Sequence, residues 1–257
     1  LTFPLAADYL LERYPKGSRV VTNICSTRAL DDVVARHGCI LEKSKVGQAN
    51  VIDLVRALGA VAGGEGSGSF TFGPQRGFDG FLMAGLLLEA IAVRKKPLSG
   101  QLQELPRYHI VKQTIPYNSP HAYQQLRQLR LEFGEEVECS DLDGLRFDWP
   151  DGFLSLRLST TDALLRLISE SKNPELAAEL TGPITEWLKL DSETEQRINA
   201  LPEPAAEQLA DYRELGELLR QKLEHYRSWC AAYNRAVTAP PFCWLPKNSK
   251  FSQRELF

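Results

Sequence analysis

The chain contains few of the residues that metal-binding and disulfide-rich proteins depend on. Its 257 residues contain one methionine, four histidines and five cysteines. The histidines and cysteines form no CxxC, HExxH or other zinc-ligand spacing, and an odd cysteine count disfavours a disulfide framework. No apolar run reaches the roughly 18 residues of a membrane span, and no charged-then-apolar leader opens the chain. These absences favour a cytoplasmic protein.

The charge of the chain is nearly balanced. Thirty Lys and Arg residues stand against thirty-three Asp and Glu residues, which gives a formal net charge of −3. A protein that binds nucleic acid or an anionic membrane by electrostatics needs a basic surplus. We therefore expect neither a nucleic-acid nor a membrane partner.

The length suits two domains, since domains commonly have about 100–150 residues. The chain begins at Leu1 without a methionine and leads almost at once into an apparent helix. We therefore expect a fragment or a processed chain.

Up to residue 98 the pattern alternates short β-rich runs with helical stretches. Such alternation predicts an α/β domain with a mainly parallel sheet, in which sites lie in loops beyond the strand ends. The expected helices cover residues 5–13, 28–37, 49–58 and 79–93, and the expected strands cover residues 19–24, 39–43 and 60–62.

A second pattern begins after residues 99–106, a mostly polar stretch that we interpret as a linker. Pro150-Asp151-Gly152 lies between two alternating runs and indicates a hairpin. Residues 107–190 are therefore predicted to form an α+β domain with an antiparallel sheet. Its expected strands cover 108–115, 137–139, 145–149, 153–158 and 164–170, and its helices cover 119–131 and 174–180.

Residues 191–257 form a third part, a long helical C-terminal extension. Between Pro204 and Pro240, apolar side chains recur at intervals of three and four, which marks one face of a helix. That face either packs onto its own domain or pairs with a second copy. The possibility of a homodimer that forms through this helix therefore stays open.

Backbone flexibility is concentrated in the first domain, where eight of the eighteen glycines fall between Gly63 and Gly85. The densest part, Gly64-Glu65-Gly66-Ser67-Gly68, follows an expected buried strand. It is not a phosphate-binding P-loop, because no Gly-Lys-Ser/Thr follows. Glu65 and Ser67 would suit adjacent sugar hydroxyls, since a carboxylate accepts hydrogen bonds and a serine donates or accepts them. A plain glycine-rich turn is the alternative.

A second candidate loop lies between two expected strands of the other domain. Arg157, Ser159, Thr160 and Thr161 offer one guanidinium and three hydroxyls, a donor set that can bind a phosphate. Asp162 disfavours a strongly anion-binding pocket unless it points away. A simple Ser/Thr turn is the alternative.

Together these residues resemble the C-terminal half, the third and fourth domains, of the α-D-phosphohexomutases, a superfamily of phosphomannomutases, phosphoglucomutases and phosphoglucosamine mutases. The sugar loop of that family, GE-x-SG, is similar to Gly64–Gly68, and its phosphate loop, R-x-SNT, is similar to Arg157–Thr161 with Thr160 in place of Asn. The resemblance covers residues 1–190 and includes segments at 26–30, 45–48 and 143–147.

The resemblance implies an isomerase of carbohydrate metabolism. A phosphoserine would give its phosphate to a hexose monophosphate and recover the other phosphate from a hexose 1,6-bisphosphate intermediate. Glu65 and Ser67 would bind the sugar, with weaker roles for Lys45 and Gln48. Arg157, Ser159, Thr160 and Thr161 would bind the phosphate that is not reacting. The linker at 99–106 would act as a hinge.

The resemblance also has gaps. Neither the phosphoserine loop nor the magnesium-binding DxDxDR loop of the family occurs in these residues. No nucleophile and no metal ligand are therefore expected here; both, with Mg²⁺, would belong to an N-terminal half, and this chain alone should be inactive. Ser69 and Gln48 stand where many members have histidine, which leaves the choice of hexose open. A non-catalytic sugar-phosphate-binding module and a helical interaction protein are alternatives.

Overall fold

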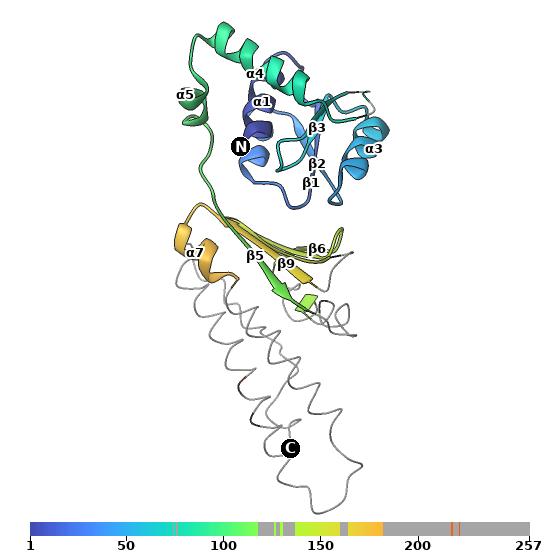
Figure 1. Ribbon diagram of the computed structural model, residues 1–257, viewed down its shortest axis with the longest axis vertical. Helices are drawn as coiled ribbons and strands as arrows, with labels where there is room; N and C mark the ends of the chain where they lie inside the picture. Colours follow the sequence, from blue (N-terminus) through green and yellow to red (C-terminus); the bar gives the residue numbers. More distant parts are fainter. Residues whose placement is uncertain are drawn as a thin grey trace, which may run out of the picture. The chain divides into compact units, whose positions relative to one another are not determined.

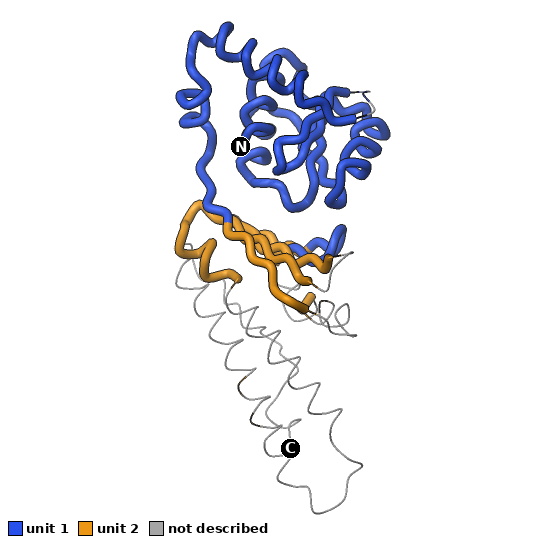
Figure 2. Tube along the Cα trace, viewed as in Figure 1, with its two compact units in different colours: residues 1–110, 140–146 blue, residues 111–139, 147–257 orange. Residues whose placement is uncertain are grey.

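The computed structural model of the chain describes residues 1–73, 75, 77–117, 126, 129, 130, 137–159, 164–181, 217 and 221. The chain divides into two compact units (Figure 2): residues 1–110 with 140–146 form unit 1, and residues 111–139 with 147–257 form unit 2. No helix within the described ranges is long and apolar enough to cross a membrane.

Unit 1 contains a four-stranded sheet with strand order β2-β1-β3-β4 (Figure 1). Strand β1 pairs in parallel with both β2 and β3, and β4 adds an antiparallel edge. The sheet is therefore mainly parallel, as the alternating pattern predicted. Its elements are α1 (Thr2–Leu11), β1 (Arg19–Asn23), α2 (Ala29–Arg36), β2 (Ile40–Ser44), α3 (Gln48–Leu58), β3 (Ala62–Gly64), β4 (Phe70–Phe72), α4 (Gly80–Arg94) and α5 (Leu98–Leu102).

Helices cover both faces of this sheet because successive side chains of a strand point to opposite sides. In β1, Val20 belongs to the core with α1, α2 and α4, whereas Val21 packs with Val51 and Val55 of α3. Both valines are fully buried. Unit 1 is therefore a three-layer α/β/α sandwich.

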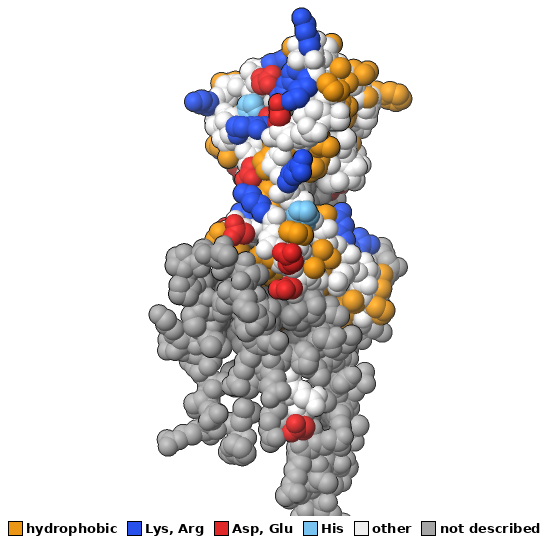
Figure 3. Space-filling model, turned by 90° about the vertical axis from the view of Figure 1, so that its left-hand side faces the viewer, with side chains coloured by type: hydrophobic (Ala, Val, Ile, Leu, Met, Phe, Trp, Pro, Cys, Tyr) orange, Lys and Arg blue, Asp and Glu red, His pale blue; other side chains and the backbone are white. Residues whose placement is uncertain are grey.

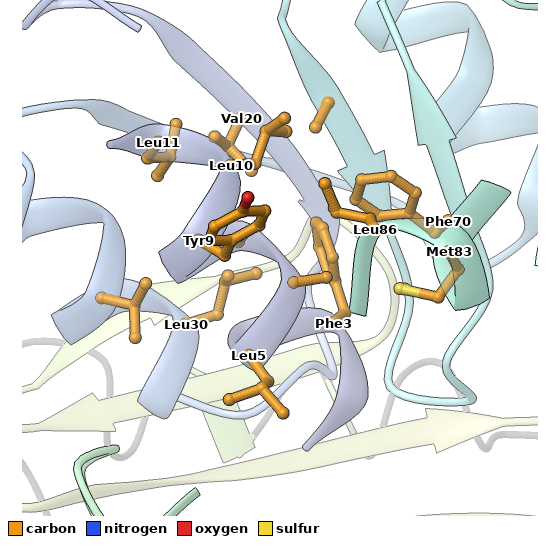
Figure 4. Packing of buried hydrophobic residues seen from close by; sticks show 14 of the residues in the cluster. Phe3, Leu5, Tyr9, Leu10, Leu11, Val20, Leu30, Phe70, Met83 and Leu86 are labelled. Atoms are coloured by element: carbon orange, nitrogen blue, oxygen red, sulfur yellow. The ribbon is translucent and has the colours of Figure 1, made fainter. Parts of the chain in front are cut away.

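The larger core lies beneath α1, a helix that is buried along nearly its whole length (Figure 4). Phe3 from α1 meets Phe70 from β4 edge to face, with ring centroids 5.4 Å apart. Met83 and Leu86 of α4 belong to the same cluster. These contacts place the turn between β3 and β4 directly against the N-terminal end of α1.

One carboxylate lies within this apolar helix. Asp8 is 7% exposed, and its Oδ1 accepts a hydrogen bond from Arg36 and lies 2.8 Å from Nε2 of His37. Its Oδ2 accepts from Arg94 at 3.1 Å. Burial alone would raise the pKa of Asp8, but the hydrogen bonds from His37 and Arg36 and the charges of Arg36 and Arg94 outweigh it, so the pKa lies below its usual value. The network joins α1, α2 and α4.

The helices and strands expected in unit 1 are all present within a few residues of their predicted ends, with three differences. The third strand is β3 at Ala62–Gly64 rather than at residues 60–62, and neither β4 nor the short helix α5 was predicted. Two glycines at the end of β3 obscured this third strand, because glycine lowers strand propensity. They are required here for space: a Cβ on Gly63 would lie 2.5 Å from Cγ2 of Val55.

The described part of the second sheet has strand order β5-β9-β8-β7-β6. Strands β8 and β9 pair antiparallel from Gly152–Ser171 to Leu158–Leu165, and β7 and β8 meet at the predicted hairpin. This is the separate antiparallel sheet that the hairpin signal predicted. Its elements are β5 (His109–Pro116), β6 (Glu138–Ser140), β7 (Leu145–Trp149), β8 (Gly152–Leu158), β9 (Leu164–Ser171) and α7 (Pro174–Glu179).

The stretch expected as a linker, residues 99–106, starts inside helix α5. Gln101 of α5 is buried, accepts a hydrogen bond from Arg94 and donates one to the carbonyl of Lys96. The beginning of this stretch is thus attached to α4. Apart from single residues, the helix expected at 119–131 and the helical extension expected at 191–257 lie outside the described residues.

The surface of the described residues carries mixed charge. On the face shown in Figure 3, basic and acidic side chains are interspersed. Several form ion pairs within unit 1, among them Arg13–Glu89 at 2.8 Å and Lys43–Asp31 at 2.8 Å. The face shown therefore carries no large patch of one charge sign.

Candidate functional site

The glycine-rich segment predicted to bind a sugar is the turn between β3 and β4. The Glu65 N–H donates to the Ser69 carbonyl at 3.0 Å, and the Gly68 N–H donates to the Glu65 carbonyl at 3.0 Å. Gly68 has φ +90, a conformation that non-glycine residues rarely adopt. The turn is therefore closed by its own backbone hydrogen bonds at the end of β3.

The strand order places this turn at a topological switch point. The connection from β1 leads to β2 on one side, whereas β3 lies on the other side of β1. In open α/β sheets, ligands bind outside the carboxyl ends of the strands at such a point. Asn23 ends β1 and Glu65 follows β3, so both residues lie at this edge.

The Glu65 side chain is fixed through one of its two oxygens. Oε1 accepts from Nδ2 of Asn23 at 2.8 Å and from the backbone N–H of Gly47 at 2.9 Å. Among the described residues, Oε2 has no hydrogen-bond partner, and the side chain is only partly buried. Glu65 therefore offers a second, oriented oxygen to a ligand.

Asn23 is itself fixed by its neighbours. Its Oδ1 accepts from the Cys25 N–H at 3.0 Å and from the Ser26 hydroxyl at 3.1 Å. Ser26 Oγ lies 2.6 Å from Thr22 Oγ1, which is 2.9 Å from the carbonyl of Gly64. A buried polar network therefore connects the end of β1 with the end of β3.

The carboxylate of Glu65 also lies at the N-terminus of α3. Gly47 is the N-cap residue of this eleven-residue helix. The preceding N–H, that of Val46, donates to Oδ2 of Asp143 at 2.9 Å. Helix N-termini favour anions because their first N–H groups lack partners within the helix. Two carboxylates from distant parts of the sequence thus satisfy adjacent N–H groups here.

The segment that carries Asp143 belongs to unit 1 although its neighbours in sequence do not. Arg146 is 1% exposed, and its guanidinium donates to the carbonyl of Ile24, just after β1. Asp143 and Arg146 come from the segment whose sequence resembled the family. In the structure they contact the loops that follow β2 and β1.

The remaining residues predicted to bind sugar lie near this edge and are accessible. The hydroxyls of Ser67 and Ser69 are 2.9 Å apart in the turn. Lys45 follows the last residue of β2, and Gln48 opens α3; both are exposed. Glu65 is thus the group with the most fixed side chain among these residues, and Lys45, Gln48 and Ser67 are exposed.

The predicted phosphate loop is described in part. Arg157 is the second-to-last residue of β8 and Ser159 follows the strand, where its N–H donates to the carbonyl of Leu164 at 2.8 Å. Thr160 and Thr161 lie outside the described residues. In the β8–β9 ladder, Arg157 is directly opposite Arg166, which is exposed. Two guanidinium groups therefore project from the same face of the sheet beside the loop.

Sequence reasoning missed Asn23, the Gly47 N–H and Arg166. Asn23 did end a predicted strand, and polar residues at the carboxyl ends of parallel strands are a usable signal. Arg166 could be found only from the register of β8 with β9. Within the described ranges, no group of three His, Cys, Asp or Glu side chains could bind a metal ion, so no magnesium ligand is assigned there.

Comparison with known sequences gives a consistent family. Residues 2–108 match the phosphoglucomutase/phosphomannomutase alpha/beta/alpha domain III. A probable phosphoglucosamine mutase of Pyrococcus furiosus is 32% identical over 183 residues, which is 68% of this chain and 39% of that protein. A phosphoglucomutase/phosphomannomutase of Thermococcus kodakarensis is 30% identical over 182 residues, 69% of this chain and 39% of that protein. The chain thus spans about two fifths of the length of these relatives.

Solved structures give the same fold. A phosphoglucomutase/phosphomannomutase family protein from Burkholderia thailandensis matches 69% of this chain and 38% of its own, with a TM-score of 0.58 and 29% identity. A putative phosphomannomutase from Thermus thermophilus matches 69% of this chain and 37% of its own, with a TM-score of 0.51 and 22% identity. The second likeness concerns the fold alone.

Proposed function

Because the chain corresponds to the C-terminal half of an α-D-phosphohexomutase of the phosphoglucomutase/phosphomannomutase type, we propose that it is the sugar- and phosphate-binding half of such an enzyme. The whole enzyme interconverts a hexose 1-phosphate and a hexose 6-phosphate through a phosphoserine and a hexose 1,6-bisphosphate. The N-terminal half carries the serine and supplies Mg²⁺, which neutralises the charge of the transferred phosphoryl group. This chain alone binds substrate without turning it over.

The observation that carries the proposal is the fixed Glu65 carboxylate at the switch point between β1 and β3. One oxygen is occupied by two donors, and the other is available for sugar hydroxyls. Ser67 and Ser69 add hydroxyls that both donate and accept. A group that recognises ring hydroxyls can bind a hexose in either of the two orientations that the reaction requires.

The phosphate that is not reacting is bound by the other loop. Arg157 and Ser159, with Thr160 and Thr161 of the same segment, supply the donors. Arg166 lies directly opposite Arg157 in the β8–β9 ladder and so adds a second positive charge beside this loop. We propose that the sugar domain covers residues 1–98 and the phosphate domain residues 107–190.

The test measures binding by the chain itself. Glucose 1-phosphate, mannose 1-phosphate and glucosamine 6-phosphate are titrated into the wild type, Arg157→Ala and Glu65→Gln by calorimetry. Hydrogen bonds to charged groups contribute about 1.5–3 kcal/mol, so each variant should bind roughly 10- to 100-fold more weakly. Arg56→Ala, which removes an exposed arginine of α3, is the control and should bind like the wild type.

The two variants should also separate the ligand's two ends. Arg157→Ala should weaken inorganic phosphate as a competitor, whereas Glu65→Gln should leave it unchanged. Equal hexose phosphate binding by Arg157→Ala and the wild type would refute the phosphate assignment. If a gene that includes the upstream sequence encodes neither the serine nor the magnesium loop, the non-catalytic binding module replaces the enzyme.

A further inference from the structure

We infer that Asn23 is a positioning residue that determines which oxygen of Glu65 faces the ligand and keeps that carboxylate a pure hydrogen-bond acceptor. The inference rests on the proposed sugar site. It adds a residue that the sequence did not single out. Its basis is the buried network between the ends of β1 and β3.

The orientation of the Asn23 amide follows from its partners. A backbone N–H can only donate, so the Cys25 N–H identifies the atom that it meets at 3.0 Å as the oxygen, Oδ1. The other atom of the amide is then the NH₂ group, Nδ2, which faces Oε1 of Glu65 at 2.8 Å. The Ser26 hydroxyl bonds the same Oδ1 and stabilises this orientation.

The consequence is an asymmetric carboxylate. Oε1 receives two N–H donors, from Asn23 and from Gly47, whereas Oε2 receives none from the described residues. Both partners of Oε1 are N–H groups that can only donate, so Glu65 acts as the acceptor toward each of them. The ligand-facing oxygen therefore selects ligand groups that donate, such as hydroxyls, and rejects anionic ones.

An aspartate at position 23 would remove this property although it has nearly the same size. It would place a second carboxylate within hydrogen-bond distance of Glu65, and two such groups take up a shared proton. Sugar binding would then depend on pH. Residue 23 thus determines specificity through its chemistry and not only through its shape.

The first experiment compares the wild type with Asn23→Asp and Asn23→Ser. Glucose 1-phosphate is titrated at pH 5.5 and pH 8, with inorganic phosphate as a second probe. Asn23→Asp should bind glucose 1-phosphate roughly tenfold more weakly at pH 8 and recover partly at pH 5.5, because a donor to Glu65 is lost and a shared proton restores one. Phosphate binding should not change in either variant.

Asn173→Asp provides the matched control. Asn173 caps α7 through its Oδ1, and Asp caps helices equally well, so the same chemical change should have no effect there. A merely structural role of Asn23 would lower the melting temperature and weaken both probes equally at both pH values. That outcome would overturn the inference.

A second measurement does not require any ligand. In a proton–nitrogen NMR titration, the amide resonance of Gly47 reports on the Glu65 oxygen that it contacts. Asn23→Asp and Glu65→Gln should each shift this resonance, because the first changes the group beside Oε1 and the second changes the group that accepts from the Gly47 N–H; Asn173→Asp should leave it in place. An unchanged Gly47 resonance in both variants would refute the positioning role. If the wild type binds no hexose phosphate, the proposed function fails while this measurement still decides the inference.

Discussion

The substitution Gly64→Ala tests how the turn proposed to bind the sugar is held in place. Gly64 is the last residue of β3 and is buried. A Cβ there would lie 2.6 Å from the carbonyl oxygen of Ser69 and 2.8 Å from the ring of Phe3. The first atom is backbone that closes the turn, and the second belongs to the core beneath α1. Neither can move away without disturbing its own contacts.

The expected loss of stability follows from these contacts. Overpacking of this kind costs about 1–3 kcal/mol. Displacing Ser69 also weakens its 3.0 Å hydrogen bond with the Glu65 N–H, a further loss of about 1 kcal/mol. Alanine also lowers the conformational entropy of the unfolded chain relative to glycine, which offsets about 0.4–1 kcal/mol of this loss. We expect a net loss of about 2 kcal/mol, or a melting temperature roughly 8–15 °C lower for a unit of this size.

Gly66→Ala is the control within the same turn. A Cβ on Gly66 would meet nothing within 4 Å, and Gly66 does not have a positive φ. This variant should be as stable as the wild type or slightly more so. Urea denaturation should show a midpoint roughly 1 M lower for Gly64→Ala only, and only that variant should lose hexose phosphate affinity. Equal midpoints for the two variants would refute the packing argument.

Two further predictions concern stability. Asp8→Asn should destabilise unit 1 by about 2–3 kcal/mol at pH 7, less than a fully buried pair because Arg36 is partly exposed. The pKa of Asp8 is lowered in the folded state, so its contribution to stability is present above about pH 4 and is lost as the pH falls through the folded pKa. The wild type and Asp8→Asn should therefore become equally stable in acid. Urea denaturation midpoints measured from pH 7 to pH 3 would show this. Asp79→Ala should lower stability by about 1 kcal/mol, because the Asp79 carboxylate accepts from the Phe81 and Leu82 N–H groups at the start of α4. Asp79→Asn should lose little stability in the same urea assay, since Asn also caps helices. An equal loss of stability in both variants would contradict the capping role.

Local sequence patterns predicted most of the fold. The 3.6-residue and two-residue periods of the apolar side chains identified the helices and strands of unit 1, and the Pro-Asp-Gly turn identified the β7–β8 hairpin. One exception was α5, which lies where a linker was expected, and another was β4, a three-residue strand that follows a glycine-rich turn. Its identity depends on pairing with β3, and a strand that short has no periodicity of its own.

Some residues of the candidate site were likewise predicted from local sequence, and others were found only in the structure. Glu65, Ser67 and Arg157 were predicted as candidates from local motifs, because the polar groups of each loop lie within a few residues of sequence. Asn23 and Arg166 were not, because their roles depend on partners that are distant or set by strand register. A motif shows which groups are present, whereas strand pairing shows which groups meet.

The amino-acid sequence by itself determined the classes of element, the balance of charge, the glycine-rich turn and the family resemblance, since these depend on composition and short-range spacing. Only the tertiary structure decided that Glu65 presents one oxygen and not two. That outcome requires β1 and β3 to be neighbours, and α3 to begin beside them. The contact between residues 23 and 65 is a consequence of strand order, which no local pattern encodes.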